Sequence, residues 1–249
     1  MTDEYFDIAN YTGHKALDEL KMCYDIYELT IAQVLRLNNV NIQFMDFKPK
    51  TDIYEIIETT SVADLDIEKL DAINCQHLSG CLRTLRKKEV EYCINSSVFF
   101  QIMLEADIND FKPEYEDKRF DFKMKWKTLF DENNATDEIR NYFNDYFSVI
   151  YRGIRVPNVH PKKQKGLDNT HLLRFEQVQK GMMKGWFCFV YLLNLKNGLN
   201  LDYKENWKQM CNSIHQIPVN PDKKRLKKLD KLAIDLSKKA SNELNKKSG

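Results

Sequence analysis

The sequence TDEIRNYFNDYFSVIYRGIR, residues 136–155, has the pattern of an amphipathic helix and indicates an all-α fold. Thr136 can cap a helix, and the two residues after it are acidic, which suits the positive end of the helix dipole. Apolar side chains then recur on one helical face, at Ile139, Tyr142, Phe143, Tyr146, Ile150 and Ile154. The pattern predicts an amphipathic helix that ends near Val156, because the residue before Pro157 is pushed away from helical dihedrals.

The same periodicity recurs on both sides of this helix. It predicts further helices over His14–Leu37, Leu70–Leu85, Val90–Ile108, Phe122–Leu129 and Leu172–Leu195, the second and third nearly continuous. Polar stretches predict surface loops at Asn109–Asp121 and Glu132–Ala135, and Asn197-Gly198 stops the last helix. Residues 40–60 stay ambiguous, because a strand-like alternation at 42–47 is followed by a helical spacing at 53–57.

Composition supports an all-α fold with three parts. Eight Gly and six Pro in 249 residues are too few turn-formers for an all-β sandwich. We expect a mostly helical N-terminal segment over 1–64, a helical bundle over 65–200, and an extension over 201–249 that ends in a basic helix. Ten Lys or Arg and four Asp or Glu lie between Asp222 and Lys247. Two interpretations of this tail remain open, namely a surface for RNA, an anionic membrane or an acidic partner, and a solvated terminal helix.

The N-terminus and the cysteines predict a cytoplasmic protein without a metal or other cofactor. No apolar run reaches the roughly 18–20 residues that cross a bilayer, and the acidic start of the chain lacks a secretory pattern. The six cysteines include no C-x-x-C pair, so neither a zinc site nor a thioredoxin-like site is indicated. We therefore expect reduced thiols and no association with a membrane.

An arginine and a histidine flank Pro157 where the helix over 136–155 ends. The guanidinium of Arg155 matches a phosphate group bidentately, and the imidazole of His160 exchanges protons near neutral pH. Together they suit phosphodiester cleavage without a metal, with charge stabilisation at Arg155 and proton transfer at His160. The spacing alone is a weak signal, and an ordinary loop histidine is the alternative interpretation.

The segment RVPNVHP, residues 155–161, resembles the Arg-x(4–6)-His motif of HEPN domains. These are small helical bundles, found among other places in bacterial toxin–antitoxin and phage-defence systems. Upstream, EADIN at 105–109 is similar to a Glu-Ala-x-Ile-Asn pattern on an earlier helix of many such domains. FKMKWK at 122–127 resembles a Lys-Trp element that precedes the motif helix. The resemblance covers about residues 70–196.

The resemblance implies a HEPN-type bundle that acts as a metal-independent endoribonuclease, of the kind that serves as a toxin or defence effector. The ribose 2′-hydroxyl would attack the adjacent phosphate and leave a 2′,3′-cyclic phosphate and a 5′-hydroxyl. His160 would act as general base or acid, and Arg155 would stabilise charge on the phosphate. The residues implied to support this pair are Glu105, Asn109 and Asn158. Those expected to hold neighbouring phosphates of RNA are Arg152, Lys162, Lys163 and Lys165.

The resemblance also implies partners, and one departure leaves the function open. A homodimer would place two motifs in one shared cleft, and an antitoxin or another protein would be a further partner. Val156 stands where the family usually has Asn, Asp or His. Two hypotheses therefore remain, an active RNase and a non-catalytic helical interaction module. Arg155, His160 and both prolines favour the first, and Val156 favours the second.

Overall fold

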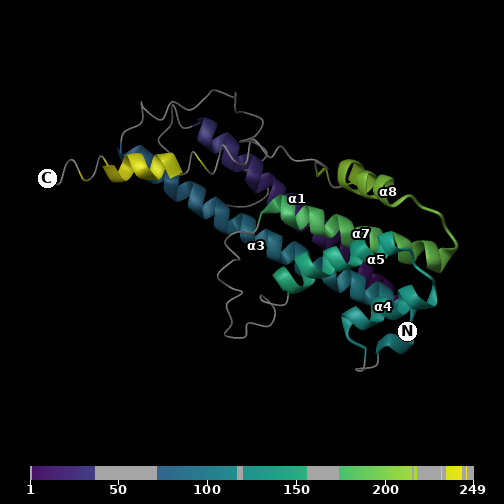
Figure 1. Cartoon of the computed structure of the whole chain (residues 1–249). Helices are drawn as coiled ribbons and strands as arrows, with labels where there is room; N and C mark the ends of the chain where they lie inside the picture. Colours follow the sequence, from purple (N-terminus) through teal and green to yellow (C-terminus); the bar gives the residue numbers. More distant parts are fainter. Residues whose placement is uncertain are drawn as a thin grey trace. The chain divides into compact units, whose positions relative to one another are not determined.

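Helices make up the regular structure of this chain wherever its structure is described (Figure 1). The computed structural model describes residues 2–36, 72–116, 120–155, 174–214, 216–217 and 234–242, with the single residues 231 and 245. No strand occurs in these ranges. The prediction of an all-α protein is thus confirmed for them. The ambiguous stretch at 40–60 lies outside them.

The elements follow the predicted order, with two additions. The α-helices are α1 (Thr2–Arg36), α3 (Ala72–Phe111), α4 (Phe122–Glu132), α5 (Asp137–Tyr146), α7 (Phe175–Asn197) and α8 (Tyr203–Gln209). Short helices of other geometry are η2 (Pro113–Glu116), η3 (Phe147–Arg155) and η5 (Met210–Ile214). The nearly continuous pair of predicted helices is one long helix, α3. The additions are α8 and η5, which the periodicity of the sequence did not predict.

The predicted loop at Asn109–Asp121 is wrong at its start. Helix α3 continues to Phe111, and a 3₁₀ turn, η2, follows directly after Lys112. The reason is burial, since Tyr115 in η2 is 2% exposed and stacks on Phe120, with ring centroids 5.2 Å apart. The buried ring of Tyr115 thus gives regular structure to η2, although the charged composition of this segment suggested a surface loop.

Side-chain caps define where the helices around the motif begin and end. Asp121 accepts a hydrogen bond from the Met124 amide at 2.8 Å and starts α4. Thr136 caps α5 in the same way, as the sequence predicted, by accepting from the amide of Ile139. Gly198 ends α7 with a φ of 61°, a left-handed conformation that favours glycine. The caps thereby fix where α4 and α5 begin and where α7 ends.

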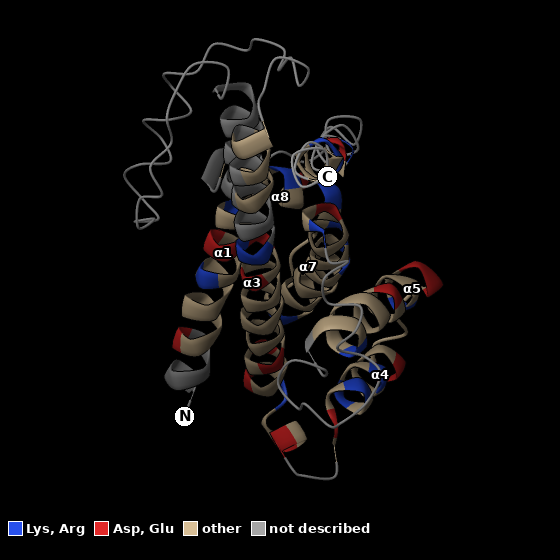
Figure 2. Cartoon of the chain, turned by 90° about the vertical axis from the view of Figure 1, so that its left-hand side faces the viewer, with Lys and Arg blue, Asp and Glu red and all other residues tan. Residues whose placement is uncertain are grey.

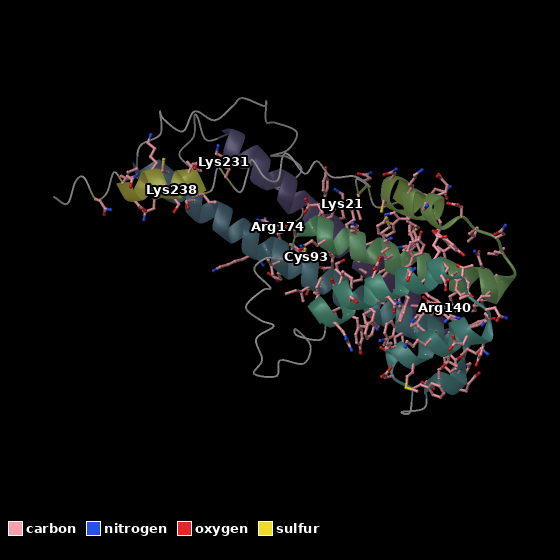
Figure 3. All side chains as sticks on the ribbon, in the orientation of Figure 1. Lys21, Cys93, Arg140, Arg174, Lys231 and Lys238 are labelled. Carbon is pink, nitrogen blue, oxygen red and sulfur yellow. The ribbon has the colours of Figure 1, made fainter. Side chains whose placement is uncertain are left out.

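Arg140 stabilises the turn between α4 and α5 by hydrogen bonds. Its guanidinium bonds Asp131 at 2.6 Å and the Phe130 carbonyl at 3.0 Å, and its Nε donates to the Ala135 carbonyl. Figure 3 labels this side chain among those of the neighbouring helices. The two helices are consequently held as a hairpin by one side chain from α5.

The chain divides into two compact units, and α1 and α3 contribute to both. The first unit contains residues 1–22 and 90–219, and the second contains 23–89 and 220–249. In the first unit, α1 packs on α3, where Ser96 donates a hydrogen bond to the Ala16 carbonyl at 2.7 Å. In the second, the Cys23 thiol donates to the Glu89 carbonyl, and residues 234–242 are helical.

Helix α7 lies at the centre of the first unit, against α3 and α5. Its approach is so close that a Cβ placed on Gly185 would lie 2.5 Å from Phe100 of α3 and 2.7 Å from Tyr146 of α5. Glycine is required there because any side chain would overlap both rings. On its outer side α7 carries α8, where the Trp186 indole donates to the Asn206 side chain at 2.8 Å.

Two further properties of the described helices bear on function. Five cysteines are described, and all of them are buried: Cys23, Cys75, Cys93, Cys188 and Cys211. Among the helices that the structure describes, none combines the length and apolar character that a membrane-spanning segment requires.

Candidate functional site

The segment that carries Arg155 is a wide helical turn rather than a continuation of α5. The sequence predicted one helix over 136–155, whereas the α-helix ends at Tyr146 and the π-helix η3 runs from Phe147 to Arg155. Buried side chains recur at every fourth residue there, at Tyr146, Ile150 and Ile154. That spacing fits an α-helix and a wider turn alike, so the sequence could not distinguish them. Turns of this kind are rare and occur frequently at functional sites.

A buried lysine joins the two sequence elements that lie upstream of the motif. Lys125 of α4 is 5% exposed, and its ammonium donates a hydrogen bond to the Asn109 side-chain oxygen at 2.7 Å. The same ammonium lies 3.8 Å from a carboxylate oxygen of Glu105, one turn earlier on α3. We call these three residues the Lys125 cluster. It brings together Glu105 and Asn109, which the resemblance implied as supporting residues.

The chemistry of the Lys125 cluster explains why a charge is tolerated at this depth. A buried ammonium is costly unless hydrogen-bonded and paired with an opposite charge. Asn109 supplies the hydrogen bond from a side chain that is itself 9% exposed, and Glu105 supplies the opposite charge from a more exposed position. The cluster therefore fixes the distance between α3 and α4 through polar contacts.

Trp126, next to the buried lysine, is a core residue. It is fully buried, and its ring lies 5.6 Å from Phe143 and 5.7 Å from Phe130, measured between centroids. Trp186 of α7 is likewise a core residue, at 5% exposed. Neither indole is placed to stack on an incoming base.

Three nearly parallel aromatic rings connect α4 to η3. Tyr151 stacks on Phe147 with centroids 4.7 Å apart, and on Phe122 with centroids 5.2 Å apart. The interplanar angles are 16° and 14°. Because Phe122 and Phe147 are buried, this ring stack fixes the orientation of η3 against the first turn of α4.

Two cations lie over the same ring of this stack. The Arg152 guanidinium is 5.3 Å from the Phe147 ring centroid, and the Lys123 ammonium is 5.2 Å from it. Both distances fall within the range of a cation–π contact. Arg152 is exposed, as a residue expected to touch RNA must be. Lys123 was not singled out from the sequence, because only the fold brings it beside η3.

A buried carboxyl group lies near the Lys125 cluster on α3. Burial raises the pKa of Asp107 to about 7, with a further contribution from Asp110 and an opposing one from Lys196. One oxygen of Asp107 is buried without a hydrogen-bond partner in the described part of the chain. Asp110, one turn on, forms an ion pair with Lys196 of α7. Sequence reasoning assigned no role to Asp107, since burial on α3 is a tertiary property.

The remaining predicted site residues lie outside the described structure. They are the side chain of Arg155 and the residues Asn158, His160, Lys162, Lys163 and Lys165. The backbone of Arg155 is described as the last residue of η3. The convergence of Arg155 and His160 accordingly stays a prediction.

Comparisons with protein-family models, with curated proteins and with solved structures each gave no match.

Proposed function

We propose that this protein is a metal-independent endoribonuclease of the HEPN type, with Arg155 and His160 as its catalytic pair. The observation that carries the proposal is the Lys125 cluster. Two sequence patterns that were recognised separately, at 105–109 and 122–127, meet through a buried hydrogen bond of 2.7 Å. The resemblance places these two patterns on neighbouring helices, as they are in this chain.

The geometry before the motif is consistent with the proposal. Arg155 closes η3, which the ring stack holds against α4 through contacts of 4.7 and 5.2 Å. A guanidinium that must meet a phosphate loses less entropy on binding when its helix is already fixed. The residues after it, Val156 and Pro157, continue the chain toward His160.

The proposed reaction is an intramolecular transfer within RNA. The 2′-oxygen attacks the adjacent phosphorus, the bond from phosphorus to the 5′-oxygen breaks, and a 2′,3′-cyclic phosphate forms. The proton of the 2′-hydroxyl leaves to a base and a proton reaches the departing 5′-oxygen, and His160 carries one of these transfers. Arg155 stabilises the negative charge that develops on the phosphoryl oxygens.

The test is cleavage of mixed RNA in the presence of EDTA. We expect the wild type to produce cyclic-phosphate ends. Arg155→Ala and His160→Ala should each lower the rate of cleavage at least about tenfold, since acid–base groups contribute roughly 10²–10⁴-fold. His14→Ala, at an exposed position of α1, is the matched control and should cleave as the wild type does. Equal cleavage by all variants, or none by any, would refute the enzymatic function.

The non-catalytic alternative is favoured by one residue, Val156, and has its own readout. If the polar residue usual at this position assists the catalytic pair, Val156→Asn should raise the rate of cleavage. RNA binding by the wild type without cleavage, even with Val156→Asn, would indicate a binding module instead. Light scattering tests the accompanying proposal of a homodimer, which predicts twice the mass of one chain.

A further inference from the structure

Two cations from different helices converge on one aromatic ring beside the proposed site. Lys123 belongs to the first turn of α4 and Arg152 to η3, and both lie within 5.3 Å of the Phe147 ring centroid. Since both distances are measured to the same ring centroid, the two charged groups lie at most 10.5 Å apart, although they are distant in sequence. We call them the Phe147 cation pair.

The charge of this pair is not neutralised by an ion pair in the described part of the chain. Other basic side chains in the same unit do have carboxylate partners, as Arg140 has Asp131 and Lys196 has Asp110. The carboxylate next to Lys123 in sequence, Asp121, instead accepts the capping hydrogen bond of α4. Basic residues of α4 are visible in blue in Figure 2. Two cations around one ring, neither neutralised by a described carboxylate, make a favourable position for an anion.

The ring under the pair is held in place by packing. Phe147 is 7% exposed and stacks on Tyr151 at 4.7 Å, with an interplanar angle of 16°. Phe122, in the same turn of α4 as Lys123, stacks on Tyr151 from the other element at 5.2 Å. Because Phe122 and Phe147 are buried, the two helices that carry the cations are held against each other. A preorganised pair pays less entropy when it binds a phosphate.

We propose that Lys123 and Arg152 bind the backbone phosphates of a single RNA strand next to the cleavage motif. The position follows from the chain, because Arg152 is three residues before Arg155 on η3. The proposed strand would run from the Phe147 cation pair to Arg155. This inference rests on the proposed function, and it adds Lys123 as a residue that binds substrate without reacting.

The experiment measures the affinity of a fluorescein-labelled single-stranded RNA of mixed sequence by anisotropy. All proteins carry His160→Ala, so that the probe is not cleaved. We expect Lys123→Gln and Arg152→Gln each to weaken binding roughly three- to tenfold, the effect of one charge-assisted contact. Each should also lower the slope of log affinity against log salt by about 0.7, the value for one phosphate contact on a single strand.

Matched variants separate a specific contact from a change in net charge. Lys204→Gln, at an exposed position of α8, removes the same charge and should leave affinity and slope unchanged. Lys123→Arg should retain binding, since the charge stays over the ring. The inference is overturned if the wild-type pair binds no RNA, or if the Lys123 and Arg152 variants match the Lys204 control.

The outcomes also distinguish this inference from the proposed function. Loss of affinity in the Lys123 and Arg152 variants, with no cleavage by the wild type, would support the phosphate contacts and reject the nuclease. Cleavage by the wild type with unchanged affinity in both variants would support the nuclease and reject the contacts.

Discussion

The ammonium nitrogen of Lys125 lies 2.7 Å from the side-chain oxygen of Asn109, and both side chains are buried. The two residues come from different helices, α4 and α3, and Glu105 adds a carboxylate 3.8 Å from the same nitrogen. If either side chain is removed, the other stays buried without this hydrogen bond. Substitution of either residue is therefore expected to destabilise the protein.

Replacing Lys125 should therefore lower the free energy of unfolding more than replacing an exposed lysine of the same helix. Lys125→Met keeps the length of the apolar stem and leaves the Asn109 oxygen unpaired, which costs about 1–3 kcal/mol. Lys127→Met, at an exposed position of the same helix, should change the free energy of unfolding by at most about 0.5 kcal/mol. Urea denaturation measures both. Equal effects would mean that the buried hydrogen bond contributes nothing.

A second buried pair, Tyr146 and Gln101, invites a double-mutant cycle. The tyrosine hydroxyl donates to the amide oxygen of Gln101 at 2.5 Å, and the amide nitrogen has no partner among the described residues. Tyr146→Phe would leave that oxygen unpaired too, at a cost of about 1–3 kcal/mol. Adding Gln101→Leu removes the orphaned amide and should recover part of the loss. Strictly additive effects in thermal denaturation would contradict this coupling.

Two glycines in helices should respond in opposite directions to alanine. At Gly185 an added Cβ would lie 2.5 Å from Phe100, so Gly185→Ala should destabilise by about 1–3 kcal/mol through overpacking. At Gly80 no atom of the described residues lies within 4 Å of an added Cβ, so Gly80→Ala should stabilise by up to about 1 kcal/mol through helix propensity. Chemical denaturation of both variants checks the prediction, and the same sign at both sites would refute it.

The buried carboxyl of Asp107 should make stability depend on pH. Because its pKa is raised to about 7 by burial, the folded state keeps a proton that the unfolded chain, with the ordinary value of 3.8, releases. This group therefore lowers the free energy of unfolding as the pH rises from about 4 to about 7, by up to about 1.4 kcal/mol per pH unit. Above that window its effect is constant.

Asp107→Asn isolates this contribution. The variant should gain stability relative to the wild type as the pH rises through the same window, and the difference should level off above about pH 7. Denaturation curves of both proteins at a series of pH values provide the measurement. A difference that does not vary with pH would show that the carboxyl titrates alike in the folded and unfolded chains.

The helices were largely predictable because their signals are local. The Thr136 cap and the Gly198 stop lie where the sequence predicted them, since both depend on residues within a turn of the helix end. Helix α8 was missed although it begins with a local signal, in which Asp202 accepts from the Glu205 amide at 2.7 Å. A helix of seven residues is too short for apolar periodicity to reveal it.

The candidate site was predictable in its residue types but not in its contacts. Glu105 and Asn109 were selected from a pattern, and the structure adds that Lys125 of another helix binds both. Lys123 and Asp107 gained interest only through packing, because the cation–π contact and the burial arise between helices. No pattern within one helix contains that information.

Two of the buried cysteines can report local unfolding of the helices that contain them. Burial raises the pKa of the Cys211 thiol to about 12, and it also raises the pKa of Cys188, which is completely covered in α7. A thiol reagent attacks the thiolate, so neither residue can be modified until its helix exposes it and lets it ionise. Since the two sulfurs belong to α7 and η5, the rates at which they are alkylated under native conditions would time the fluctuations of those two elements separately.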